Sequence, residues 1–226
     1  MTAATDWSAR RAALIAGPVV YAAAITAYLW FGYPASRLPM WLHVIAWISL
    51  IGFPLATNMA TGLWFDGNGF RTTGVRLDNL GQSFLAVLPV ALGLAVLLAI
   101  AGFALDSLRV PPLPVLLDKG ATYAGFGPAQ QFLINAYAIR QFRLAGLSDR
   151  TAIGLAAVLF ALVHFPNLLV MGTTAVIVVL FAPIFLRVPN IITLGLAHGA
   201  LALCVYWMLP GSWHHNLAIG IRCCAG

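Results

Sequence analysis

Five polar side chains lie within long apolar stretches of the sequence. They are two adjacent glutamines and an asparagine, Gln130, Gln131 and Asn135, followed by two histidines, His164 and His198. A buried imidazole is a common ligand for a metal or a tetrapyrrole, and buried amides form hydrogen bonds between helices. On a helix, Gln131 and Asn135 share a face, whereas Gln130 is rotated by about 100°. A polar group inside a membrane span is costly unless it is paired, so function is expected at these positions.

The composition indicates that the surrounding elements are membrane helices. The 226 residues are 62% hydrophobic and 8% charged, with a mean hydropathy of +0.93, whereas soluble domains are roughly 45–50% apolar and about 25% charged. The net charge of +6 comes from twelve basic residues scattered singly or in pairs. This placement is typical of the ends of membrane helices and argues against nucleic-acid binding.

Apolar segments of about 20 residues predict an all-α, polytopic helix bundle that forms a single integral membrane domain over residues 1–226. We expect about seven spans, within a range of six to eight, at 12–33, 40–65, 83–105, 120–142, 151–166, 169–186 and 189–209. The short fifth span and the sixth could instead form a broken or re-entrant element. Eight Lys and Arg residues on one side against four on the other predict a cytoplasmic N-terminus, and we expect the bacterial inner (cytoplasmic) membrane.

The acidic residues exclude one kind of chemistry. All six are aspartates, they lie at or beyond the ends of the predicted spans, and the chain contains no glutamate. A mechanism that needs a glutamate base is therefore excluded. After the last span, the adjacent pair His214 and His215 is interpreted as interfacial.

The motifs QQFLIN at 130–135 and FALVH at 160–164, with His198 on a later helix, resemble the CPBP membrane proteins, which include the type II CAAX prenyl endopeptidases. The family pattern is two adjacent glutamates with an arginine four residues after the second, then Phe-x-x-x-His, then a histidine followed four residues later by asparagine. Phe160, His164 and His198 match this pattern. The resemblance covers residues 72–209, with extra N-terminal helices in 1–71 and a C-terminal tail in 210–226.

The departures from this pattern fall at the catalytic positions that the resemblance implies. Gln130 and Gln131 replace the two glutamates, Asn135 replaces the arginine, and Ala202 replaces the final asparagine. A glutamine cannot accept a proton near neutral pH, and loss of a general base commonly lowers the rate by about 10²–10⁴.

Three functions therefore remain open. The favoured hypothesis is a catalytically degenerate family member that acts as a binding, scaffold or accessory subunit, with other integral membrane proteins and the lipid bilayer as partners. The first alternative is an intramembrane endopeptidase with a water activator other than glutamate. The second is a pigment or haem subunit that uses His164 and His198. Because no carboxylate or thiolate is predicted beside these histidines, no metal site or other cofactor is expected.

Overall fold

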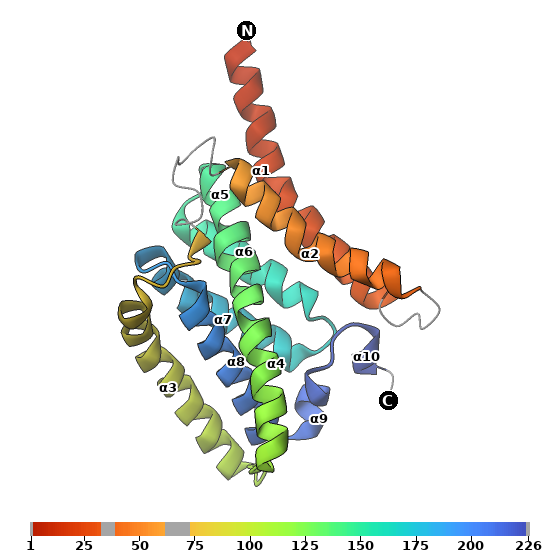
Figure 1. Cartoon of the computed structure of the whole chain (residues 1–226), viewed down its shortest axis with the longest axis vertical. Coiled ribbons are helices and arrows are strands. Elements are labelled where there is room, and N and C mark those ends of the chain that lie inside the picture. The colour runs from red at the N-terminus through yellow and green to blue at the C-terminus, as the bar shows by residue number, and fades with distance from the viewer. Residues whose placement is uncertain (1, 33–38, 62–72, 225–226) are drawn as a thin grey trace.

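The computed structural model describes residues 2–32, 39–61 and 73–224, and every regular element within these ranges is helical (Figure 1). The first half contains α1 (Thr2–Ala27) with η1 (Tyr28–Gly32), α2 (Met40–Thr61), α3 (Leu80–Ala104), α4 (Leu113–Gln131), η4 (Phe132–Ile139) and α5 (Arg140–Leu144). The second half contains α6 (Asp149–Val163), α7 (Leu168–Arg187), α8 (Ile191–Met208), α9 (Gly211–His214), η5 (His215–Leu217) and α10 (Ile221–Cys224). The prediction of an all-α helix bundle is confirmed.

Five of the described helices are long and apolar enough to cross a membrane. They cover Trp7–Phe31, Met40–Thr61, Leu80–Ala104, Leu168–Arg187 and Ile191–Met208, and they correspond to five of the seven predicted spans. The fourth predicted span is divided among α4, η4 and α5, and the fifth corresponds to α6, which has only 15 residues. The chain is an integral membrane protein with several apolar helices.

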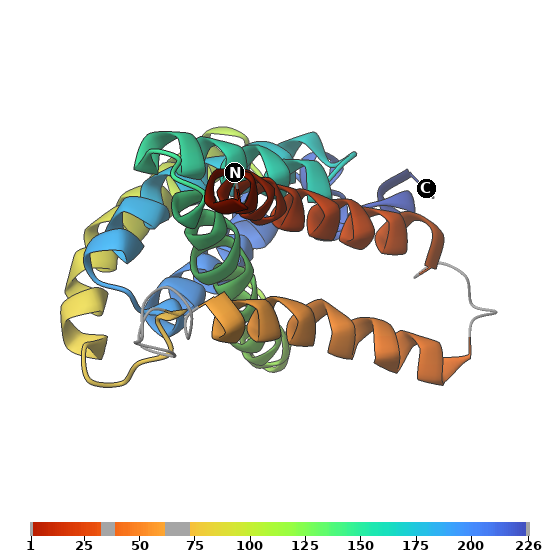
Figure 2. The same cartoon turned by 90° about the horizontal axis from the view of Figure 1, so that it is seen from above.

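The helices form a bundle from which α1 and α2 extend (Figures 1 and 2). Within the bundle, α8 packs against both α3 and α4, and α6 packs against α7. Hydrogen bonds from Tyr21 to the Leu50 carbonyl and between Tyr28 and His43 connect the two N-terminal helices to each other. Their predicted spans contribute few buried residues, so most of their apolar surface faces outward.

Glycines bring α4 and α8 into backbone contact. A Cβ atom added to Gly195 would lie 2.3 Å from the Pro128 Cα, and one added to Gly127 would lie 2.1 Å from the Gly195 carbonyl oxygen. A Cβ at Gly199 would meet the Tyr123 carbonyl oxygen at 2.7 Å. The pair Gly195 and Gly199 is thus a small-xxx-small contact that lets the two helices approach closely.

Asn190 joins the start of α8 to the segment before α3. Its side-chain oxygen accepts the backbone N–H groups of Ile192 and Thr193 and so caps α8. Its Nδ2 donates to the Arg76 carbonyl and the Asn79 side chain, each at 2.8 Å. The Ile191 N–H donates to the carbonyl of Gly74, which has a φ of +74° that glycine adopts readily.

The helix that contains the start of the fourth predicted span begins earlier than the span itself. Helix α4 begins at Leu113, well before the predicted start at residue 120, so Asp118 lies more than one turn inside a helix and is exposed there. Pro112 and Pro114 account for this early start, because proline is tolerated in the first turn of a helix, where its missing N–H has no intrahelical partner. Asp66 lies outside the described residues.

Candidate functional site

A chain of three polar side chains connects the end of α4 and η4 to α8. The Asn135 Nδ2 donates to the Gln131 Oε1 at 2.6 Å, and the Gln131 Nε2 donates to the His198 Nδ1 at 2.8 Å. The three residues are only 2%, 1% and 5% exposed, respectively. Because Nδ1 of His198 accepts this bond, its imidazole carries its proton on Nε2 and is neutral. The predicted hydrogen bonding between helices through these amides is confirmed.

His164 is held by the backbone of its own helix. Its Nδ1 donates to the Phe160 carbonyl at 2.6 Å, one turn back along α6. The Phe160 ring meets the His164 ring edge-to-face with centroids 4.6 Å apart, and it meets the His198 ring in the same manner at 6.0 Å. The Phe160 ring therefore contacts both imidazoles.

The local helix geometry separates the two glutamines. A π-helical segment, η4, follows Gln131 directly, and a proline, Pro128, lies one turn before it. Such wider turns occur often at functional sites. Gln131 points to His198, whereas Gln130 is half-buried and lines two cavities. The different orientations predicted for the two glutamines are thus confirmed.

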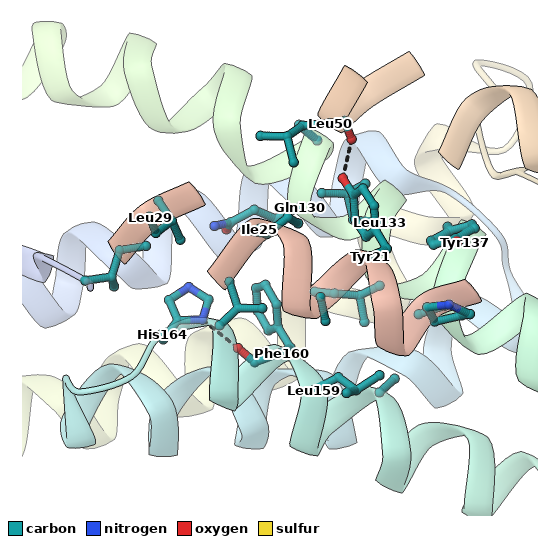
Figure 3. A pocket seen from close by; sticks show the side chains of 18 of the residues that line it. Tyr21, Ile25, Leu29, Leu50, Gln130, Leu133, Tyr137, Leu159, Phe160 and His164 are labelled. Carbon is teal, nitrogen blue, oxygen red and sulfur yellow. Dashed lines mark hydrogen bonds between the residues drawn. The ribbon is translucent and has the colours of Figure 1, made fainter. Parts of the chain in front are cut away.

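The first cavity has a volume of about 390 Å³ and lies between α1, α2, α4, η4 and α6 (Figure 3). Its walls are almost entirely apolar, with Ile25, Leu133 and Leu159 among the lining residues. The volume falls within the range of about 300–1,000 Å³ that is typical of ligand pockets. His164 lies at one part of the wall, and Tyr137, whose buried hydroxyl has no hydrogen-bond partner, lies at another.

A second, smaller cavity of about 110 Å³ brings the two histidines together. Gln130, His164 and His198 all line it, and Ala202 lines it from α8. Gln130 and His164 also line the first cavity, so the two cavities adjoin at these side chains. This is the space in which a reacting group would meet both imidazoles.

The donor groups at this site do not fit a metal ion. Within the part of the chain that the structure describes, no three His, Cys, Asp or Glu side chains form a group that could hold one. The site offers two imidazoles and amides, and the Nδ1 atoms of both imidazoles are already in hydrogen bonds.

The sequence reasoning missed a second buried polar cluster. The Arg140 guanidinium donates to the Thr61 hydroxyl at 2.5 Å, and the Asn58 Nδ2 donates to the Ala136 carbonyl at 2.7 Å. Gln141 contacts both Asn58 and Thr61 at 3.4 Å. Two signals could have indicated this cluster: Arg140 falls inside a predicted span, and Asn58 and Thr61 are three residues apart in another.

The structure buries His214, which the sequence analysis interpreted as interfacial. The side chain is 1% exposed and packs beside Tyr206, and the turn that carries it is fixed by Asn167, whose Nδ2 donates to the carbonyls of His214 and Ala218. Burial, and then the positive charge of Arg109, lowers the pKa of the His214 imidazole. The apolar contacts of α8 and α9 that bury this ring are tertiary and leave no local pattern.

The fold and site together define a polytopic helical membrane protein with a space between its helices that two imidazoles line, without a carboxylate among the described lining residues. The model of the type II CAAX prenyl endopeptidase Rce1-like family matches residues 121–204, from within α4 to within α8. Over this segment the chain is similar to the Rce1-like family, and the segment contains all seven motif positions identified in the sequence. No curated protein and no solved structure matches the chain.

Proposed function

We propose that this protein is a catalytically degenerate Rce1-like membrane protein that acts by binding. The single observation that carries the proposal is the chain from Asn135 through Gln131 to His198, because neutral amides occupy the positions of the family's glutamates and arginine. A glutamine cannot take a proton from water near neutral pH. The hydrogen bonds instead hold α4, η4 and α8 together.

The proposed partners are other integral membrane proteins. Three of the five candidate spans, α1, α2 and α3, bury few of their residues within the chain and expose large apolar side chains such as Ile48, Phe84 and Leu97. Helix α2 makes only limited contact with the bundle, chiefly at η4. These surfaces are available to the helices of a partner as well as to lipid.

The test is to identify what co-purifies with the full-length protein extracted in a mild detergent. We expect a defined membrane protein to co-purify at a fixed ratio and to be released when Ile48→Asn is introduced on the exposed face of α2. A matched substitution, Val179→Asn on the exposed face of α7, controls for the general effect of a polar group in a span outside the proposed partner surfaces. A monomer without any co-purifying protein would refute the subunit role.

A second candidate function is an intramembrane endopeptidase, because Gln130, His164 and His198 share one cavity. In such an enzyme, a water beside the two imidazoles would need activation by a group other than glutamate. An assay with a prenylated CAAX peptide distinguishes this candidate. Cleavage that is abolished by His164→Ala would support it, and equal signals from the parent and the variant would refute it.

A further inference from the structure

A third cavity, of about 560 Å³, lies beside the first turns of α4 and the C-terminal segment, and its character differs from that of the other two. Helices α4, α8 and α10 and the turn at η5 form its walls. Six of its lining side chains carry polar groups: Lys119, Thr122, Tyr123, Tyr206, Asn216 and Arg222.

The charges of this third cavity favour an anion. Lys119 on α4 and Arg222 on α10 bring two positive charges to it, and no aspartate is among its described lining residues. The hydroxyls of Tyr123 and Tyr206 and the amide of Asn216 add further donors. A guanidinium has five N–H donors, so Arg222 can donate to an anion alongside contacts within the protein.

The backbone beside this cavity adopts an unfavourable conformation. His215, Asn216 and Leu217 have φ angles of +46°, +54° and +56°. Asparagine tolerates this region, but histidine and especially leucine rarely adopt it. The turn places Asn216 on the third cavity and Leu217 on the second, so these two neighbouring residues line different cavities.

The third cavity adjoins the other two. Tyr123 and Phe126 line both the third and the second cavity, while Phe126, Gln130 and His164 line both the second and the first. A cationic space is thus followed by a small mixed space and then by a large apolar one. This order suits a ligand with an anionic head and a long apolar chain, whereas a free anion would occupy the third cavity alone.

We propose that Lys119 and Arg222 bind the phosphate of an anionic membrane phospholipid, whose acyl chain passes Phe126 and enters the second cavity toward the first. Both cations lie outside residues 121–204, which the family model matches, so the site is a feature of this chain beyond its Rce1-like segment. The proposal does not depend on whether the histidine site is catalytically active.

The test uses native mass spectrometry of the full-length protein titrated with phosphatidylglycerol. Each charge-assisted hydrogen bond to phosphate is worth about tenfold or more in affinity. Lys119→Gln combined with Arg222→Gln is therefore expected to weaken lipid retention by about tenfold or more. The control pair Arg150→Gln with Arg187→Gln removes two exposed cations elsewhere and is expected to retain the lipid.

Additional variants and ligands distinguish the effects of charge, of folding and of the source of the phosphate on binding. Lys119→Arg with Arg222→Lys keeps both charges and is expected to bind, which shows that the site tolerates substitution. Ala202→Phe, which fills the second cavity, is expected to weaken binding of phosphatidylglycerol but not of inorganic phosphate. Equal retention of phosphatidylcholine, or unchanged retention by the double glutamine variant, would overturn the proposal. Inorganic phosphate that binds as tightly as the lipid would overturn the lipid assignment.

Discussion

The contact between α4 and α8 yields a prediction whose size follows from the structure. In Gly195→Ala, the new Cβ would lie 2.3 Å from the Pro128 Cα, whereas carbon atoms in favourable contact are about 3.5 Å apart or more. The atoms it meets belong to backbone, so no side-chain rotation relieves the overlap, and the helices must separate locally by about 1.2 Å (3.5 minus 2.3). Overpacking of this kind typically costs about 1–3 kcal/mol. We therefore expect the free energy of unfolding to fall by about 2–3 kcal/mol.

The same displacement reaches the candidate site. Gln131 follows Pro128 by three residues, and His198 follows Gly195 by three, so a shift of about 1.2 Å would lengthen their 2.8 Å hydrogen bond to about 4 Å. Denaturant titration of the detergent-solubilised protein measures the stability, and ¹⁵N NMR of the His198 ring reports the hydrogen bond. Gly172→Ala on α7 is the matched control, because nothing lies within 4 Å of its added Cβ. If the two variants are equally stable, the backbone contact is not as close as described.

Three further predictions concern the connections between elements. Asn167→Ala removes the cap of α7 and two hydrogen bonds to backbone carbonyls and should lower the free energy of unfolding by about 2–4 kcal/mol. Asn167→Asp keeps the cap oxygen but loses the Nδ2 donor and places a carboxyl group against two carbonyl oxygens, so it should lose at least as much; parent-like stability of Asn167→Asp would refute the role of the side-chain amide. In Gly74→Ala, the residue has a φ of +74° and its new Cβ would lie 2.6 Å from the Phe185 ring, whereas in Gly146→Ala the φ is +82° and nothing lies within 4 Å of the new Cβ. Thermal unfolding should therefore show a loss of stability that is larger for Gly74→Ala by about 1–3 kcal/mol; similar losses would exclude the steric contribution. Because burial lowers the pKa of His214, its contribution to stability is present above its unfolded pKa of about 6.5 and is lost as the pH falls through its folded pKa. The stability of the parent should therefore decrease between pH 7.5 and pH 5, and His214→Gln should decrease less over the same interval; identical pH profiles would contradict this assignment.

Much of the fold could be predicted from the sequence because the bilayer imposes a strong pattern. Apolar runs located the helices that became α1, α2, α3, α7 and α8. The interior of the fourth predicted span was less predictable. Nothing in its composition indicates that residues 132–139 form a π-helix, since this geometry depends on packing against neighbouring helices. The start of α4 was also missed, because the helix begins at Leu113 and the predicted span begins at residue 120.

The candidate site could also be predicted from the sequence only in part. Helical spacing correctly oriented Gln131 and Asn135 together and Gln130 elsewhere. The partner of each imidazole could not be predicted, because it depends on the rotation of α6 and α8. The cavities could not be predicted either, since their walls come from helices that are distant in sequence, including α1.

Cleavage of a prenylated CAAX peptide by the purified protein tests the central claim most directly. The parent is expected to release no product above the level of His164→Ala, because no carboxylate among the described residues lines the site to activate water. A variant that carries Gln130→Glu, Gln131→Glu and Asn135→Arg restores the family pattern and serves as the comparison. Product formed only by this variant would support loss of the activity through these substitutions. Product formed by the parent, and lost in His164→Ala, would contradict the proposal that the protein acts by binding.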